Sequence, residues 1–93
     1  TNPAKIFGCY PQKGTIAVGA DADILVWDPN KRHTISASTH HMKCDYNVYE
    51  GLKVKGVPQQ VYLRGKRIVD GGIWLGKNGE GRFVRRAPHA PVL

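Results

Sequence analysis

Side chains that could do chemistry are scattered along this chain, and the four histidines are considered first. His40 and His41 are adjacent, His33 lies seven residues before them, and His89 lies near the end. Neighbouring side chains on an extended chain point to opposite sides, and zinc ligands are usually spaced by roughly two to five residues. This spacing disfavours a metal site. The alternative is that one histidine bonds the backbone while the other meets solvent or a neighbouring domain.

Two carboxylates form the next candidate site. Asp21 and Asp23 alternate across Ala22, so on a strand they would share a face, as in an acid pair or a cation site. However, Asp21 falls in a predicted turn and Asp23 opens an apolar run. Turn capping by Asp21 and a bond from Asp23 to a neighbouring group therefore explain the pair equally well.

Nucleophilic catalysis and thiol chemistry have weaker signals. A hydroxyl, an imidazole and a carboxylate lie close in sequence, but their spacing matches no nucleophile elbow; the residues are Ser36, Ser38, Thr39, His40 and Asp45. Cys9 and Cys44 have neither redox nor metal-ligand spacing. They would form one disulfide in an exported protein, but no signal-peptide pattern is visible, so two free thiols are expected.

The glycine-rich run 76–82 is followed by Phe83 and two arginines. It lacks the Gly-Lys-Ser/Thr ending of a phosphate loop. The stretch 82–86 could bind phosphate with Phe83 stacking, or it could be an arm that docks on an acidic protein surface.

Composition limits what these residues can build. The chain has 93 residues and a net charge of +7, which allows one domain and is too short for a (β/α)8 barrel of about 200 residues. No stretch approaches the roughly 20 apolar residues of a membrane span. Residues 51–93 hold nine basic and two acidic residues, whereas residues 1–50 are neutral. Nucleic acid, an anionic membrane or an acidic partner could explain a basic half, and so could a merely solubilised surface.

The pattern of elements is mainly β. Valine and isoleucine number 15 against five leucines, which favours strands. A short helix is predicted at Thr1–Gly8, capped by Thr1 or Asn2, and Arg64-Gly65 predicts a hairpin turn. We expect about five or six short strands, at 15–18, 22–27, 33–36, 60–63, 66–69 and 73–75, with 53–57 uncertain. Asp28-Pro29-Asn30 is expected to end the second of them, and 37–50 to be a loop with a helical turn.

Three sequence blocks carry a family resemblance. The run T-N-P-A-K-I-F-G followed by P-Q-K-G-T-I-A-V-G-A-D-A-D-I-L-V-W-D-P resembles the C-terminal signature of cyclic amidohydrolases. The runs I-S-A-S-T-H-H-M-K-C-D-Y-N-V-Y-E-G and G-E-G-R-F-V-R-R are similar to the dihydropyrimidinase and hydantoinase branch. Dihydropyrimidinase-related scaffold proteins share this branch but usually lack the His-His-Met found here at 40–42.

The resemblance implies a fold and a division of the chain. Residues 1–14 would be the end of the last helix of a (β/α)8 barrel and a connection. Residues 15–75 would form the C-terminal part of a small β-sandwich whose other strands belong to a missing N-terminal part of the same chain. Residues 76–93 would be an extended basic C-terminal arm that reaches a neighbouring subunit. The single methionine, Met42, and the start at Thr1 likewise suggest a fragment or processed product.

The resemblance also implies a function for the whole protein. It would hydrolyse the ring amide of dihydropyrimidines or hydantoins in the cytoplasm, as a homotetramer. Two zinc ions bridged by a carboxylated lysine would activate water, and their ligands would all lie upstream. We therefore expect no catalytic, cofactor-binding or metal residue in this chain, and no hydrolase activity from it alone. The alternatives are a non-enzymatic scaffold and a small basic nucleic-acid-binding module, which is the least favoured; no membrane association is expected.

Overall fold

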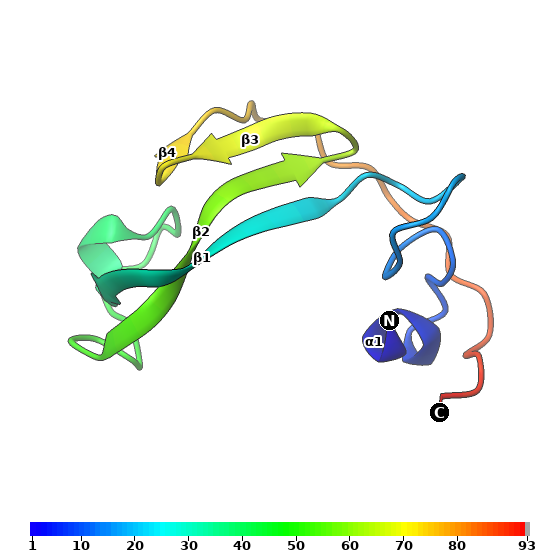
Figure 1. The fold of residues 1–93 in the computed structure, drawn as a ribbon, viewed down its shortest axis with the longest axis horizontal. Coiled ribbons are helices and arrows are strands. Elements are labelled where there is room, and N and C mark those ends of the chain that lie inside the picture. The colour runs from blue at the N-terminus through cyan, green and yellow to red at the C-terminus, as the bar shows by residue number, and fades with distance from the viewer. Residues whose placement is uncertain (93) are drawn as a thin grey trace.

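The computed structural model describes residues 1–92, which form a short helix and a four-stranded antiparallel sheet in the order β1-β2-β3-β4 (Figure 1). The elements are α1 (Asn2–Ile6), β1 (Ile24–Thr34), the 3-10 turn η1 (Ala37–Thr39), β2 (Lys53–Leu63), β3 (Lys66–Asp70) and β4 (Ile73–Trp74). The fold is therefore mainly β, as predicted. Within residues 1–92 there are four strands rather than five or six.

Helix α1 confirms the predicted N-terminal helix, with proline in its first turn and Gly8 after it at a φ of +70°. Thr1 occupies the N-cap position, but its side chain makes no cap bond. Instead, the Thr1 hydroxyl donates to the Gly14 carbonyl over 2.8 Å. The predicted capping is thus wrong in its partner, because the following loop turns back beside the helix and offers an acceptor.

The predicted strand at 15–18 does not form. Gly14 and Gly19 both have positive φ, +83° and +91°, so turns bracket only four residues. Ile16 and Val18 are 91% and 108% exposed. A segment this short, with no strand beside it, cannot complete a ladder of hydrogen bonds.

Strand β1 is longer than predicted. Asp28-Pro29-Asn30 does not end it, so the separate strands expected at 22–27 and 33–36 are largely one element. The Asp28 carboxylate accepts from the backbone N–H of Asn30 over 2.9 Å, which turns the chain locally. The pairing with β2 is irregular between Asp28 and Arg32 and then resumes. The proline therefore sits in a bulge rather than at a strand end.

Strand β2 also runs through Gly56 and Pro58, residue types that commonly interrupt a strand. Pro58 lies opposite Trp27, beside a second bulge in the β1–β2 ladder. A bulge tolerates a residue without an N–H group, so the strand continues to Leu63. The uncertain segment 53–57 is thus the first half of β2.

The Arg64-Gly65 hairpin is confirmed. Both residues have positive φ, +48° and +81°, as a tight two-residue β-turn requires. Gly71 and Gly72 also have positive φ and form the next turn, and β4 confirms the strand predicted at 73–75. None of residues 1–92 forms a buried apolar core: Gly8 and Gly56 are the buried residues, and the apolar side chains of β1 are half exposed. The sheet thus keeps both of its faces largely uncovered.

Candidate functional site

Asp21 and Asp23 belong to an ion-pair network centred on Lys13. The Lys13 ammonium lies 2.9 Å from an Asp21 carboxylate oxygen and also pairs with Asp23. Gln12 donates to Asp21 over 3.0 Å, and the Arg64 N–H donates to Asp23 over 2.9 Å. Lys13 lowers the pKa of both carboxyls, and they raise the pKa of Lys13. Both carboxylates are thus ionised and engaged, which suits a structural clamp rather than a general acid or base.

This clamp confirms the expectation that Asp23 bonds a neighbouring group. The turn capping expected of Asp21 is wrong, because its carboxylate binds Lys13 and Gln12 rather than the backbone of its own turn. The clamp fixes the β2–β3 turn, because the Gly65 N–H also donates to the Ala22 carbonyl over 2.9 Å. Sequence reasoning missed it, since the bonded pair Asp23 and Arg64 is 41 positions apart in the chain.

The histidines do not converge on a metal site. The Asn47 side-chain amide lies 2.9 Å from Nδ1 of His40. The His41 ring packs on Trp74 with ring centroids 6.1 Å apart. In the part of the chain that the structure describes, no group of three or more His, Cys, Asp or Glu side chains is placed to hold a metal ion. His40 and His41 thus act in loop and sheet packing.

The hydroxyl cluster is also a loop-stabilising arrangement. The Glu50 carboxylate accepts from the Ala37 N–H over 2.7 Å, and the hydroxyls of Ser36 and Ser38 are 2.9 Å apart. Hydrogen bonding to Ser36, and then to the Ala37 N–H, lowers the pKa of Glu50. The structure records no bond between a serine or threonine hydroxyl and a histidine here. Cys9 and Cys44 are free thiols, as expected.

The segment after β4 folds back along its own chain and ends beside α1 (Figure 1). The Ala87 N–H donates to the Gly8 carbonyl over 2.9 Å, and the Ala90 N–H donates to the Lys5 carbonyl over 3.0 Å. A Cβ at Gly8 would lie 1.8 Å from the Ala87 carbonyl oxygen, so only glycine permits this approach. Phe83 is 89% exposed, and no aromatic pair that includes it is found within residues 1–92.

The sheet itself also offers a surface that could serve function. The register places Leu25, Val61 and Val69 in one cross-strand row, with Trp74 opposite Val69. The other face carries Ile24 opposite Tyr62. Exposed apolar faces on both sides indicate docking surfaces for further polypeptide. The arrangement can hold protein against protein, whereas the carboxylates of Asp21, Asp23 and Glu50 are engaged in ion pairs or hydrogen bonds.

Residues 1–68 match the amidohydrolase family, and the chain belongs to that family. Similar proteins include the D-hydantoinase of Ralstonia pickettii, which is 56% identical over 86 residues, 92% of this chain and 19% of that protein. The dihydropyrimidinase of Rattus norvegicus is 48% identical over 93 residues, 100% of this chain and 18% of that protein. The resemblance inferred from the sequence blocks is thereby confirmed.

Solved structures agree with this placement. A D-hydantoinase superposes with a TM-score of 0.89 at 53% identity, over 96% of this chain and 20% of that one. The D-hydantoinase from Bacillus sp. AR9 superposes with a TM-score of 0.91 at 43% identity, over 99% of this chain and 20% of that one. The chain thus spans about a fifth of the length of these relatives. No helix in residues 1–92 is long and apolar enough to cross a membrane.

Proposed function

We propose that these 93 residues are the C-terminal segment of a cytoplasmic cyclic amidohydrolase that hydrolyses the ring amide of dihydropyrimidines or hydantoins. The single observation that carries the proposal is the match of nearly the whole chain to D-hydantoinases, in sequence and in fold together. A chain that superposes so closely on a fifth of such a protein is expected to serve the same part of it.

Within that protein we assign the segment a structural role. Residues 1–14 end the last barrel helix and connect it to the sheet, residues 15–75 form one part of a β-sandwich, and residues 76–93 form the C-terminal arm. The uncovered sheet supports this assignment. Leu25 and Trp27 are half exposed, and the free edge of β1 has backbone groups ready to pair with strands from the preceding polypeptide.

The family implies a metal centre, and the residues present do not fit one. No His, Cys, Asp and Glu group able to hold a metal lies in residues 1–92, and Asp21, Asp23, Glu50 and Glu80 are paired within the fold. We therefore place the two zinc ions and their carboxylated lysine in the preceding polypeptide. The catalytic and substrate-contacting residues are assigned there as well.

We further propose that the C-terminal arm contacts a second subunit of a homotetramer. Its main chain is held by Lys5 of α1 and by Gly8 just after that helix, while Phe83, Arg85 and Arg86 remain exposed. An exposed aromatic ring flanked by arginines is a composition enriched at protein interfaces. The positive charge of residues 51–93 then serves contacts between subunits.

A chimera tests the proposal directly. The 86 residues that match in the Ralstonia pickettii D-hydantoinase are replaced by those of this chain. We expect a soluble, assembled enzyme whose kcat/KM for hydantoin stays within about tenfold of the parent. The matched control carries Leu25→Asp in the same chimera, which should fail to assemble.

Two results would overturn the proposal. One is a chimera that folds and assembles like the parent but has lost hydrolysis. The other is hydrolysis of dihydrouracil by the pure 93-residue chain, which would place catalytic residues inside it. A related scaffold would differ from both: the full-length protein would fold and assemble, yet it would leave dihydrouracil and hydantoin intact.

A further inference from the structure

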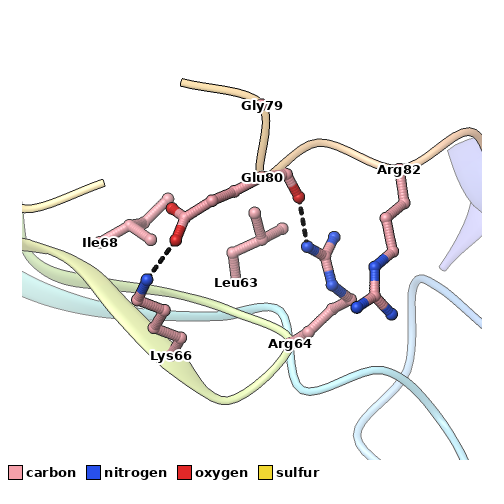
Figure 2. Close-up of a pocket in the computed structure, with 7 residues that line it drawn as sticks. All are labelled: Leu63, Arg64, Lys66, Ile68, Gly79, Glu80 and Arg82. Atoms are coloured by element: carbon pink, nitrogen blue, oxygen red, sulfur yellow. Dashed lines mark hydrogen bonds and ion pairs between the residues drawn. The ribbon is translucent and has the colours of Figure 1, made fainter. Parts of the chain in front are cut away.

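A pocket of about 340 Å³ lies between the β2–β3 turn and the segment that follows β4. Figure 2 shows its lining, in which Leu63 and Ile68 provide apolar surface and Arg64, Lys66, Glu80 and Arg82 provide charge. Three cations and one carboxylate therefore face one small space. This volume falls in the range typical of small-molecule sites.

The single carboxylate in the pocket is already engaged. Glu80 pairs with the Lys66 ammonium and accepts from the Lys77 N–H over 2.9 Å. Lys66 and then this N–H lower the pKa of Glu80, so the carboxylate is ionised at neutral pH. The Glu80 carbonyl accepts one bond from the Arg64 guanidinium. Glu80 thus neutralises Lys66 and orients Arg64, but does not neutralise the arginines.

The two arginines are left with unused donors. Arg82 has no ion pair or side-chain hydrogen bond recorded within residues 1–92, and Figure 2 shows it extending towards Arg64. Asp21 and Asp23 both pair with Lys13. The pKa of Asp21 is lowered mainly by Lys13 and Gln12 and least by the charge of Arg64. Counting Lys13, Arg64, Lys66 and Arg82 against Asp21, Asp23 and Glu80 leaves one positive charge. A bound anion would relieve the repulsion between the two guanidiniums.

We propose that this pocket binds a small monocarboxylate with a branched apolar body. Guanidinium groups recognise carboxylates through paired N–H bonds. Leu63 and Ile68 supply apolar contact for the rest of the ligand. The ionised Glu80 in the lining repels a dianion, so the pocket selects a carboxylate over phosphate. This inference is independent of the proposed hydrolase function, because none of these residues is assigned a role in hydrolysis.

Titration calorimetry with isovalerate on the full-length protein that carries these residues tests the proposal. We expect saturable binding that weakens about tenfold or more in Arg82→Gln, as loss of a charge-assisted hydrogen bond predicts. Arg82→Lys should restore part of the isovalerate binding, since an ammonium keeps the charge but not the paired N–H donors of a guanidinium. Arg82 holds no other part of the described fold, so these variants should melt like the parent protein.

Matched controls separate this site from general charge effects. Lys43→Gln removes an equal charge from an exposed loop outside the pocket and outside the C-terminal arm, and should leave isovalerate binding unchanged. Isovaleramide, which lacks the charge, should not bind, and phosphate should bind more weakly than isovalerate. The proposal is overturned if isovalerate does not bind, or if it binds equally well to the parent, Arg82→Gln and Lys43→Gln.

Discussion

The indole ring of Trp27 lies directly over the backbone of Gly56 on the neighbouring strand. A Cβ at Gly56 would stand 2.8 Å from Cζ2 and 2.9 Å from Nε1 of that ring. Gly56 has a φ of +97°, so both its backbone conformation and its lack of a side chain are needed here. The contact joins β1 to β2 beside the bulge at Pro58 and sets the path of both strands.

Gly56→Ala is therefore expected to destabilise the domain through two separate costs. The positive φ costs about 1–2 kcal/mol for an alanine, and the steric clash with the ring adds about 1–3 kcal/mol. Gly19→Ala is the matched control, because Gly19 has a similar φ of +91° but nothing within 4 Å of an added Cβ. Melting temperatures of the two variants should differ by the clash alone. Equal losses in both would contradict the Trp27 contact.

Gly8→Ala should release the C-terminal arm from α1. The new methyl group would meet the Ala87 carbonyl oxygen at 1.8 Å, so the Ala87–Gly8 hydrogen bond must break. We expect faster tryptic cleavage at Arg85 and Arg86, since a detached segment is more open to protease. Gly51→Ala, at a φ of +80° in open space, provides the control. An unchanged cleavage rate in Gly8→Ala would show that the arm is not held in this way.

Local signals were sufficient to predict the elements whose geometry is fixed by neighbouring residues. Arg64-Gly65 specified the hairpin because two residues with positive φ are needed there. Two local signals likewise specified α1: Pro3 suits the first turn of a helix, and Gly8 suits the positive φ that follows its end. Prediction failed where hydrogen-bonded pairing with the neighbouring strand continues past a residue that usually ends a strand. Pro29 was expected to end a strand, yet β1 continues past it, as β2 continues past Pro58, because bulges absorb residues that do not fit the ladder.

Contacts between distant parts of the chain gave no sequence signal. The clamp of Lys13 on Asp23 and the return of Ala87 to Gly8 join segments that no short-range pattern relates. The pocket formed by Arg64 and Arg82 was missed for the same reason. The family was nevertheless identified from the sequence blocks, because a motif match does not depend on knowing which residues touch.

Lys13→Met should lower stability at neutral pH and lose this effect in acid. Asp21 and Asp23 have lowered pKa values in the folded protein, chiefly through hydrogen bonds to Lys13. Their stabilising contribution is complete above the unfolded pKa of about 3.9 and is lost as the pH falls through the lowered folded values. The difference in melting temperature between parent and variant should thus shrink below about pH 4.

At alkaline pH the stabilising contribution of Lys13 falls as the pH rises, whereas that of the two carboxylates falls as the pH drops. Asp23 and then Asp21 raise the pKa of Lys13, so its contribution is complete below the unfolded value of about 10.4 and is lost as the pH rises through the folded value. Lys43→Met, at an exposed loop lysine with no recorded ion pair within residues 1–92, should show no such profile. A Lys13→Met effect that is constant from pH 2 to pH 7 would contradict the clamp.

Leu25→Asp should disrupt assembly of the full-length protein if the sheet is a docking surface. Leu25 lies in the cross-strand row with Val61 and Val69, and covering this row would bury an unpaired carboxylate at a cost of several kcal/mol. Val18→Asp is the control, since Val18 is equally apolar but lies in a loop outside the sheet. Soluble yield and size-exclusion profiles should separate the two. Equal tolerance of both changes would argue against burial of the sheet.

His41→Ala in the full-length protein should leave the content of the proposed zinc per subunit unchanged. His41 packs on Trp74 and joins no metal-binding group in the described part of the chain. Loss of the ring contact should cost about 0.5–1.5 kcal/mol, which appears as a modest drop in melting temperature. Elemental analysis by mass spectrometry measures the zinc, and Trp74→Leu should reproduce the thermal effect. A fall in zinc content with little change in melting temperature would instead make His41 a ligand and place part of the metal centre in this segment.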